Sequence, residues 1–229
     1  MSPVALANWL RVENADLWEA MQRHRFVTDI EQDRLPEDTM RRYFFFEYAF
    51  VETAVLIFAH ALLKAPGFAA QRKLIGTLHA LAEKQLVWFQ ECFTALGIDA
   101  EAADARPLPA AVARFANGML EIAHEGDYAA IITVMLAAEW MYATWCQRAA
   151  RGMISAPLLR AWVDLHAAAE FTAGADWLRA EVDRAGAGLD AASWQGLSRL
   201  FRQALILEID FHNAAYLSTW PVPRMKEQA

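Results

Sequence analysis

The sequence predicts an all-α protein, a bundle of long helices that forms one domain over residues 1–229. Apolar residues recur with helical spacing through most of the chain, and no segment shows the alternation of a half-buried strand. Glycines and prolines mark several of the breaks between these segments. Hydrophobic residues make up 56% of the sequence, which is enough to bury a sizeable core. Long helices joined by short connections favour a helical bundle.

The first helix is expected from about Pro3 to His24. Its apolar stripe consists of Trp9, Leu10, Leu17, Trp18 and Met21. A linker follows, and it ends in residues 33–38. Pro36 with acidic residues directly behind it predicts the start of the second helix.

The second helix contains the stretch 42–60 and continues to about Lys64, where Pro66 and Gly67 stop it. Apolar residues fall on every face of this helix, so we expect it to be central rather than half-exposed. Glu47 lies near its start among aromatic residues. A carboxylate buried there costs several kcal/mol unless it is paired or protonated. The helix is therefore expected to form the wall of a polar site.

A third helix is expected over residues 68–96, and Gly97 ends it. Its inner side is expected to carry Leu74, Leu78, Leu81, Leu86 and Phe89. Residues 98–109 form a loop that contains proline and acidic residues.

The fourth helix is expected over residues 110–125, and Gly126 breaks it. Asp127 is the expected N-cap of a fifth helix that reaches about Arg151. Pro157 opens a sixth helix that kinks or breaks before Gly174. The small-residue turn 185–188 precedes a last helix over about 190–217.

Charge and cysteine content limit the class of protein. The net charge is −7 and the isoelectric point is near 5.4, with no basic stripe, so no nucleic-acid partner is expected. Cys92 and Cys146 lie in apolar helical segments and are expected to be reduced core thiols, as in a cytoplasmic protein. No signal peptide is apparent, and acidic residues break the longest apolar stretch, so no membrane span is expected. The surplus of apolar residues suggests a homo-oligomer.

Three carboxylates interrupt apolar runs on three different helices: Glu47, Glu139 and Glu208. Bundles build polar pockets from side chains that separate helices contribute to a shared interior. Closely spaced buried carboxylates push each other's pKa values apart, so one of them can act as an acid. For any one of the three, exposure to water or a pair with an arginine remains an alternative.

The histidines give no expectation of a metal site or another cofactor. Di-metal bundles use a Glu-x-x-His motif on each of two helices. Here only Glu121 and His124 have this spacing, and no His-Glu-x-x-His sequence occurs. His212 follows Glu208 by one helical turn, and both a pair with that carboxylate and an ordinary core position stay open.

A series of short blocks resembles the TenA proteins, also called thiaminase II, which belong to a larger group with a haem-oxygenase-like helical bundle. The resemblance covers nearly the whole chain. The blocks are Leu35–Tyr43, Glu125–Tyr128, Trp140–Tyr142, Trp162–Val163 with Glu170–Phe171, and Leu207–Phe211. Each block alone is weak, but their order and spacing are similar to those of the family.

The resemblance implies a helical bundle with a deep pocket, usually in a homotetramer. It also implies hydrolysis at the C5 methylene of the thiamin pyrimidine, in salvage of damaged thiamin. The family's pyrimidine-anchoring aspartate falls on Glu47 and its catalytic glutamate on Glu208. A neighbouring aromatic residue falls on Phe211, and a pocket tyrosine falls on Tyr142.

Several positions depart from the family pattern. The nucleophilic cysteine of the family falls on Ala138, and Cys146 lies two turns away, about 12 Å along the helix. Two tyrosines of the family fall on Phe115 and His166. Covalent catalysis through a thiolate is therefore not expected in this chain.

A subclass of the family lacks the cysteine and is thought to work through carboxylates. By this resemblance, Glu139 and Glu208 would activate a water and protonate the departing amine. Glu47 would hold the aminopyrimidine edge. The residues expected to stack on the ring are Phe50, Phe115 and Tyr142.

The function expected is hydrolysis of thiamin-derived aminopyrimidines or their amides by a cysteine-independent enzyme. The alternative is a catalytically diverged relative that binds another small heteroaromatic ligand, because several pocket positions are substituted. Metal-dependent oxygenase chemistry lacks the paired histidine–carboxylate pattern that it needs. The family was once described as transcriptional regulators, and the acidic charge of this chain argues against DNA contact.

Overall fold

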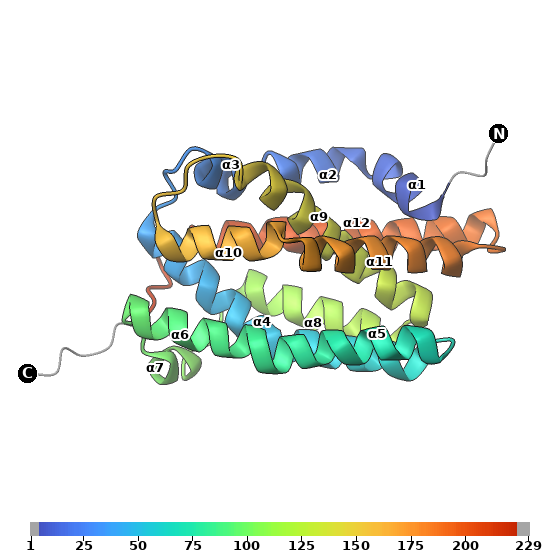
Figure 1. Ribbon diagram of the computed structural model, residues 1–229, viewed down its shortest axis with the longest axis horizontal. Helices are drawn as coiled ribbons and strands as arrows, with labels where there is room; N and C mark the ends of the chain where they lie inside the picture. The colour runs from blue at the N-terminus through green and yellow to red at the C-terminus, as the bar shows by residue number, and fades with distance from the viewer. Residues whose placement is uncertain (1–4, 224–229) are drawn as a thin grey trace, which may run out of the picture. The chain divides into compact units, whose positions relative to one another are not determined.

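The computed structural model describes residues 5–223, without the side chains of residues 102 and 104. Within this part of the chain every regular element is a helix, as the sequence predicts (Figure 1). The helices form two compact units. The first unit contains residues up to 34 and residues 125–209, and the second contains residues 35–124 and those from 210 on. The single domain over 1–229 stays a prediction.

The first unit begins with two short helices where one long helix was expected. They are α1 (Leu6–Glu13) and α2 (Ala15–Gln22), and the expected start at residue 3 lies outside the described residues. The break falls at the buried Asn14, whose side chain donates to the Leu10 carbonyl at 2.8 Å and to Ser198 Oγ at 3.0 Å. An asparagine that hydrogen-bonds locally in this way competes with helix continuation.

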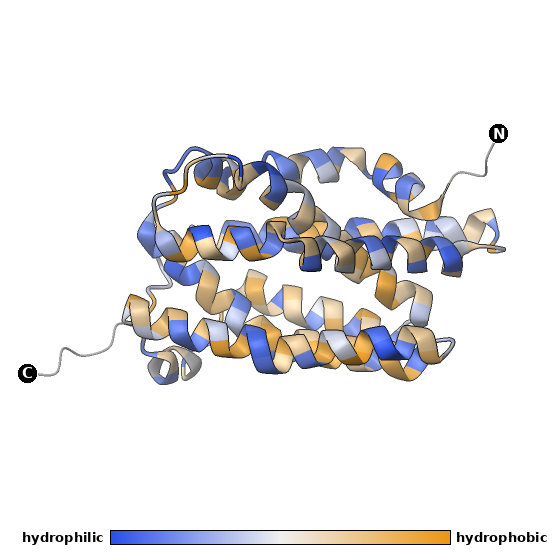
Figure 2. Cartoon of the chain, in the orientation of Figure 1, coloured by the Kyte–Doolittle hydropathy of each residue, from blue (hydrophilic) through white to orange (hydrophobic). Residues whose placement is uncertain are grey.

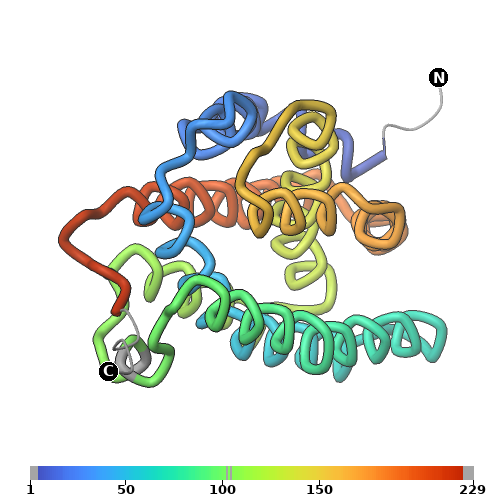
Figure 3. The backbone as a smooth tube through the Cα atoms, turned by 60° about the vertical axis from the view of Figure 1, so that its left-hand side comes forward, coloured from blue at the N-terminus to red at the C-terminus, as the bar shows by residue number. Residues whose placement is uncertain are grey.

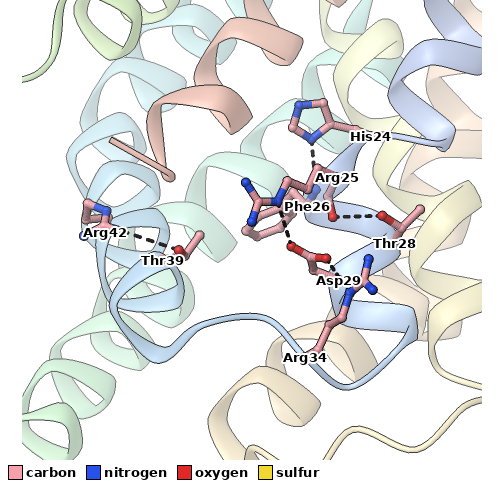
Figure 4. Close-up of polar contacts among 8 residues, drawn as sticks. All are labelled: His24, Arg25, Phe26, Thr28, Asp29, Arg34, Thr39 and Arg42. Carbon is pink, nitrogen blue, oxygen red and sulfur yellow. Dashed lines mark hydrogen bonds and ion pairs between the residues drawn. The ribbon is translucent and has the colours of Figure 1, made fainter. Parts of the chain in front are cut away.

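A third short helix, α3 (Arg25–Glu31), occupies part of the expected linker. The His24 side chain caps it by accepting a hydrogen bond from the Phe26 backbone N–H at 3.1 Å. The buried Asp29 accepts from Arg34 at 2.8 Å and from Arg25 at 3.3 Å (Figure 4). These local polar contacts stabilise a turn that apolar periodicity alone did not indicate.

Helix α9 (Tyr128–Ala149) forms the centre of the first unit. Asp127 caps it as predicted, with its side chain accepting from the Ala130 N–H at 2.9 Å. The helix packs against α2 and α3 and also against α10 (Pro157–Ala167) and α11 (Ala169–Gly186). The expected break in the sixth helix is confirmed, because α10 and α11 meet at the extended residue Ala168.

The last helix, α12 (Ala191–Ala214), supplies residues to both units. The Asp190 side chain accepts from the Ser193 N–H at 2.8 Å and so satisfies one of the free donors at the helix start. Within the first unit α12 packs on α1 and α2, with Trp194 against Trp9 and Phe201 against Trp18.

The second unit is built around α4 (Glu37–Lys64), which begins directly after Pro36 as predicted. Next to it lies one nearly continuous helical run of α5 (Phe68–His79), the π-helical segment η1 (Ala80–Gln85) and α6 (Leu86–Leu96) (Figure 3). Hydrophobic and hydrophilic residues are interspersed along this run (Figure 2).

The expected inner side of this run is only partly correct. Leu74 and Phe89 are buried, whereas Leu78, Leu81 and Leu86 are half-buried. The π-helical turn changes the phase of the helix, so a stripe extrapolated at 3.6 residues per turn does not hold across it.

Helix α4 is less central than its composition predicts. Its residues from Thr39 to Phe46 are mostly buried, but Leu56 and Leu63 are exposed. By length and composition alone, α4 and α9 are each long and apolar enough to cross a membrane. The core helix of a soluble protein meets the same criteria. In α9, 78% of the most apolar window is buried, against 33% in α4.

Two further helices complete the second unit. A short helix, α7 (Ala100–Asp104), interrupts the expected loop, and α8 (Ala110–Glu125) has its predicted bounds. Lys64 at the end of α4 donates from Nζ to the carbonyl oxygens of Ala123 and His124, both at 2.9 Å. This lysine satisfies free carbonyls in the last turn of α8 and fixes the two helices side by side.

Candidate functional site

The predicted site residues fall into two groups, one in each unit. The first-unit group consists of Glu139, Tyr142, His166 and Glu208. The second-unit group consists of Glu47, Phe50, Phe115 and Phe211. Each group combines carboxylate and aromatic side chains, which is the combination that a pocket for a flat, polar ring requires.

Glu208 is the most buried carboxylate of the two groups, with 1% of its surface exposed. It lies in the apolar segment of α12 that the sequence marked as unusual. The Tyr142 hydroxyl from α9 donates to Glu208 Oε2 at 3.5 Å. That distance exceeds the usual 2.7–2.8 Å of a hydroxyl hydrogen bond, so the contact is weak (about one kcal/mol or less). A buried carboxyl group in an otherwise apolar segment of a helix is suited to proton transfer.

Glu139 is half-buried on α9, next to the buried Ala138. Adjacent residues on a helix point about 100° apart, so Glu139 does not project where the Ala138 methyl group projects. Cys146, farther along α9, and Cys92 are both buried thiols outside any disulfide, as predicted.

His166 lies in the last turn of α10 and is 5% exposed. Its Nδ1 is 2.8 Å from the Trp162 carbonyl oxygen, and the two rings lie 4.1 Å apart. The ring also contacts Phe171 at 4.7 Å and Tyr142 at 5.6 Å between centroids. Burial lowers the pKa of His166 from 6.5 to about 4, although the hydrogen bond to Trp162 opposes this change. The imidazole is therefore neutral at physiological pH.

Glu47, in the second-unit group, is half-buried rather than fully buried. The Tyr43 hydroxyl, one turn earlier on α4, donates to Glu47 Oε1 at 2.7 Å. A hydrogen bond of this length to a carboxylate compensates for part of the desolvation that the aromatic surroundings impose. It also fixes the orientation of the carboxylate.

The aromatic members of the second-unit group are in contact with one another. The Phe50 and Phe115 ring centroids are 4.5 Å apart, and those of Phe115 and Phe211 are 4.9 Å apart. Phe115 and Phe211 are buried, and Phe50 is half-buried. Helices α4, α8 and α12 thus each contribute one ring to an aromatic cluster.

Three residues that shape these groups lie in the blocks that resemble TenA but were not predicted as site residues: Tyr43, Trp162 and Phe171. Tyr43 precedes Glu47 by four residues, and Trp162 precedes His166 by four. Residues at this spacing share a helix face, so the signal was available. Phe171 belongs to the next helix after His166, and no spacing rule connects those two residues.

The first unit also has a surface cavity of about 530 Å³ that none of the predicted site residues lines. Its charged lining residues are Arg11, Glu19, Arg23, Glu31 and Arg148. Arg23 pairs with Glu19, and Arg148 pairs with Glu31. This surface carries paired, solvated charges and adds nothing to the two groups. Among the described residues, no three histidine, cysteine or acidic side chains are placed to hold a metal ion.

Known proteins resemble this chain in both sequence and fold. An aminopyrimidine aminohydrolase of Halalkalibacterium halodurans is 26% identical over 202 residues, covering 87% of this chain and 90% of that protein. A TenA homologue from Pyrococcus furiosus has a TM-score of 0.83 at 16% identity, over 92% of this chain and 100% of that one. A TenA family transcription regulator from Silicibacter sp. TM1040 has a TM-score of 0.84 at 22% identity, over 92% and 96% of the two chains. The sequence pattern of the TENA/THI-4/PQQC family matches residues 12–218. The chain therefore belongs to the TENA/THI-4/PQQC family.

Proposed function

We propose that this protein hydrolyses thiamin-derived aminopyrimidines, or their amides, at the C5 methylene of the ring. The similarity to an aminopyrimidine aminohydrolase over most of both chains supports the reaction and the substrate class. The observation that carries the proposal is that Glu208 is buried in an otherwise apolar segment of α12, with the Tyr142 hydroxyl beside it. Burial of a carboxyl group is unfavourable for stability, and such a group is typical of a catalytic acid or base.

The proposed chemistry is a hydrolysis in which carboxyl groups transfer the protons. A water molecule attacks the methylene carbon and gives its proton to a carboxylate, while the bond from carbon to the amine nitrogen breaks. The departing amine takes up a proton from a carboxylic acid, so the products are a hydroxymethyl pyrimidine and ammonia. Glu208 and Glu139 would be the two carboxyl groups. Because Ala138 stands where the family has its nucleophile, no covalent intermediate on a thiolate is part of the proposal.

The second-unit group would bind the substrate. The aminopyrimidine edge offers a donor beside an acceptor, and a carboxyl group such as that of Glu47 complements it. The Tyr43 hydroxyl donates to one oxygen of this carboxyl group and helps to orient it. The rings of Phe50, Phe115 and Phe211 would supply apolar and stacking surface.

The biological setting is also a proposal: thiamin salvage in the cytoplasm by a homo-oligomer, such as a tetramer. Large apolar side chains on α4 and α5 support the oligomer, because Leu56, Leu63, Phe68 and Ile75 are all more than half exposed. Light scattering during size-exclusion chromatography measures the mass. A monomer at micromolar concentration would contradict this part of the proposal.

The test of the reaction is turnover of aminomethyl and formylaminomethyl pyrimidines, followed by mass spectrometry of the products. We expect the Glu208→Gln variant to lose at least about 100-fold in kcat while it stays folded. Glu121→Gln, at an exposed position on α8, is the matched control and should keep full activity. A wild-type protein that neither binds nor converts these compounds would overturn the proposal.

The second candidate is a diverged relative that binds a heteroaromatic ligand without hydrolysing it. The replacement of the family's nucleophile by Ala138 favours this candidate. A thermal-shift screen against pyrimidines and other flat bases separates the two functions, because a bound ligand raises the apparent stability whether or not it is converted. Ligands that stabilise the protein without any turnover would support the diverged binder.

A further inference from the structure

The His166 ring is held in one orientation by its neighbours. It lies 4.1 Å from the Trp162 ring on the same helix and 4.7 Å from Phe171 on α11, with Tyr142 of α9 at 5.6 Å. Only 5% of its surface is exposed. Aromatic contacts from three helices of the first unit leave little freedom for the ring to rotate.

The same surroundings fix which nitrogen of His166 carries the proton. A backbone carbonyl oxygen only accepts hydrogen bonds, so the 2.8 Å contact to the Trp162 oxygen requires a proton on Nδ1. Burial holds the pKa near 4, so a second proton is absent at neutral pH. Nε2 therefore presents a bare lone pair.

This lone pair has no partner in the described part of the chain, because the contact of Nδ1 with Trp162 is the only hydrogen bond His166 makes there. The Nε2 atom is also not fully buried. Among the described residues, the buried side-chain atoms that lack both solvent and a partner are Thr133 Oγ1 and Arg179 Nε. His166 Nε2 therefore retains some accessible surface on a side chain that is otherwise enclosed.

We infer that His166 determines specificity by accepting a hydrogen bond from an N–H group of the ligand through Nε2. This inference rests on the proposed function, whose substrates carry amino groups on the ring and on the C5 methylene. A group with only lone pairs, such as an ether oxygen, would face the Nε2 lone pair without a hydrogen between them. An apolar group would leave Nε2 without a partner, which costs enough binding energy to weaken affinity about tenfold.

The affinity test uses ligands in which a methyl group replaces one amino group at nearly constant size. The parent is 4-amino-5-aminomethyl-2-methylpyrimidine, and the two analogues lack either the ring amino group or the side-chain amino group. Calorimetry gives the dissociation constants for wild type and for His166→Phe. For one analogue, we expect the loss of affinity relative to the parent ligand to be about tenfold larger in wild type than in His166→Phe. His124→Phe, at an exposed position in the second unit, is the control and should behave as wild type.

Two results would overturn the inference. One is a loss that is the same, within about twofold, in wild type and His166→Phe for both analogues. The other comes from ¹⁵N NMR of the wild-type protein, which needs no folded variant. We expect the His166 signals to show protonated Nδ1 and bare Nε2 from pH 5 to 8, with the Nε2 signal shifting when the parent ligand binds. A proton on Nε2 of the free protein in that range would contradict the inference.

The outcomes separate this inference from the proposed function. If the protein converts the substrate but the loss of either amino group weakens binding equally in wild type and in His166→Phe, only the proposed role of His166 is refuted. If the loss of one amino group weakens binding more in wild type than in His166→Phe but no turnover occurs, hydrolysis is refuted and the recognition of an N–H group by His166 is retained.

Discussion

The low pKa of His166 predicts a specific loss of stability in mild acid. In the unfolded chain the histidine titrates near 6.5, and in the folded protein it titrates near 4. Between these values the unfolded state binds more protons than the folded state, so the free energy of unfolding falls as the pH falls. The contribution is complete above pH 6.5 and is lost as the pH approaches 4.

The size of this effect follows from the difference of about 2.5 between the two pKa values. Each pKa unit corresponds to about 1.4 kcal/mol, which gives a loss of about 3 kcal/mol between pH 7 and pH 4. This is a large fraction of the stability of an ordinary domain, which is about 5–15 kcal/mol.

Urea unfolding at several pH values measures the effect, with His166→Phe as the reference. Both proteins lose stability in acid for other reasons, so the informative quantity is their difference in free energy of unfolding. We expect this difference to shift toward the variant by about 3 kcal/mol between pH 7 and pH 4. A difference that stays constant within 0.5 kcal/mol, roughly the error of such measurements, would refute the assignment of a buried, neutral His166.

Three further predictions concern other parts of the chain. Gly186→Ala should destabilise the protein by about 1–3 kcal/mol, because the new methyl carbon would lie 2.3 Å from a side-chain atom of α1. Arg42→Met should cost about 1–3 kcal/mol in urea unfolding, since this buried arginine donates at 2.6 Å to a carbonyl just after α12. The thiols of Cys92 and Cys146 should not react with a thiol reagent at pH 8 until the protein is unfolded, because both are buried and the pKa of Cys92 is raised to about 12.

Each of these predictions has its own control. Gly174→Ala lies on the same helix as Gly186 but meets no atom within 4 Å, so it should stabilise the protein by about 0.4–1 kcal/mol. Equal effects of the two glycine changes would contradict the packing of α1 on α11. Thr39→Val removes the hydrogen bond that Arg42 donates to Thr39 Oγ1 at 3.4 Å, which is longer than the bond to the carbonyl after α12, and should cost less than Arg42→Met (Figure 4). Rapid modification of one thiol in the native protein would show that its cysteine is accessible.

The fold was predictable because it depends on the helical spacing of apolar residues and on single residues that start or end helices. Pro36, Asp127 and Pro157 each fix a helix start through a local preference, and all three starts are confirmed. Asn14 and the π-helical segment were not predictable in the same way. The first acts through a side-chain contact with Ser198, 184 residues away, and the second depends on packing that no helical repeat encodes.

The candidate site was only partly predictable. The unusual composition of its surroundings identified Glu208, and the structure shows it almost fully buried. The same reasoning overestimated the burial of Glu47, because a sequence pattern does not show which half of a long helix the rest of the protein covers. The protonation state of His166 was beyond any spacing rule, since it depends on a backbone carbonyl and on rings from two other helices.

The π-helical segment at residues 80–85 has a consequence for comparing relatives of this protein. Its wider turn accommodates one residue more than an α-helical turn would. A homologue with one residue fewer here would close the turn as a regular α-helix, and the helix beyond it would keep its direction and its rotation about the axis. The counterparts of Phe89 and Phe93, which are buried in this chain, would then stay on the interior face although their sequence positions are shifted by one. Alignments across this stretch should therefore allow a single-residue gap, after which the apolar positions of the two chains come back into phase.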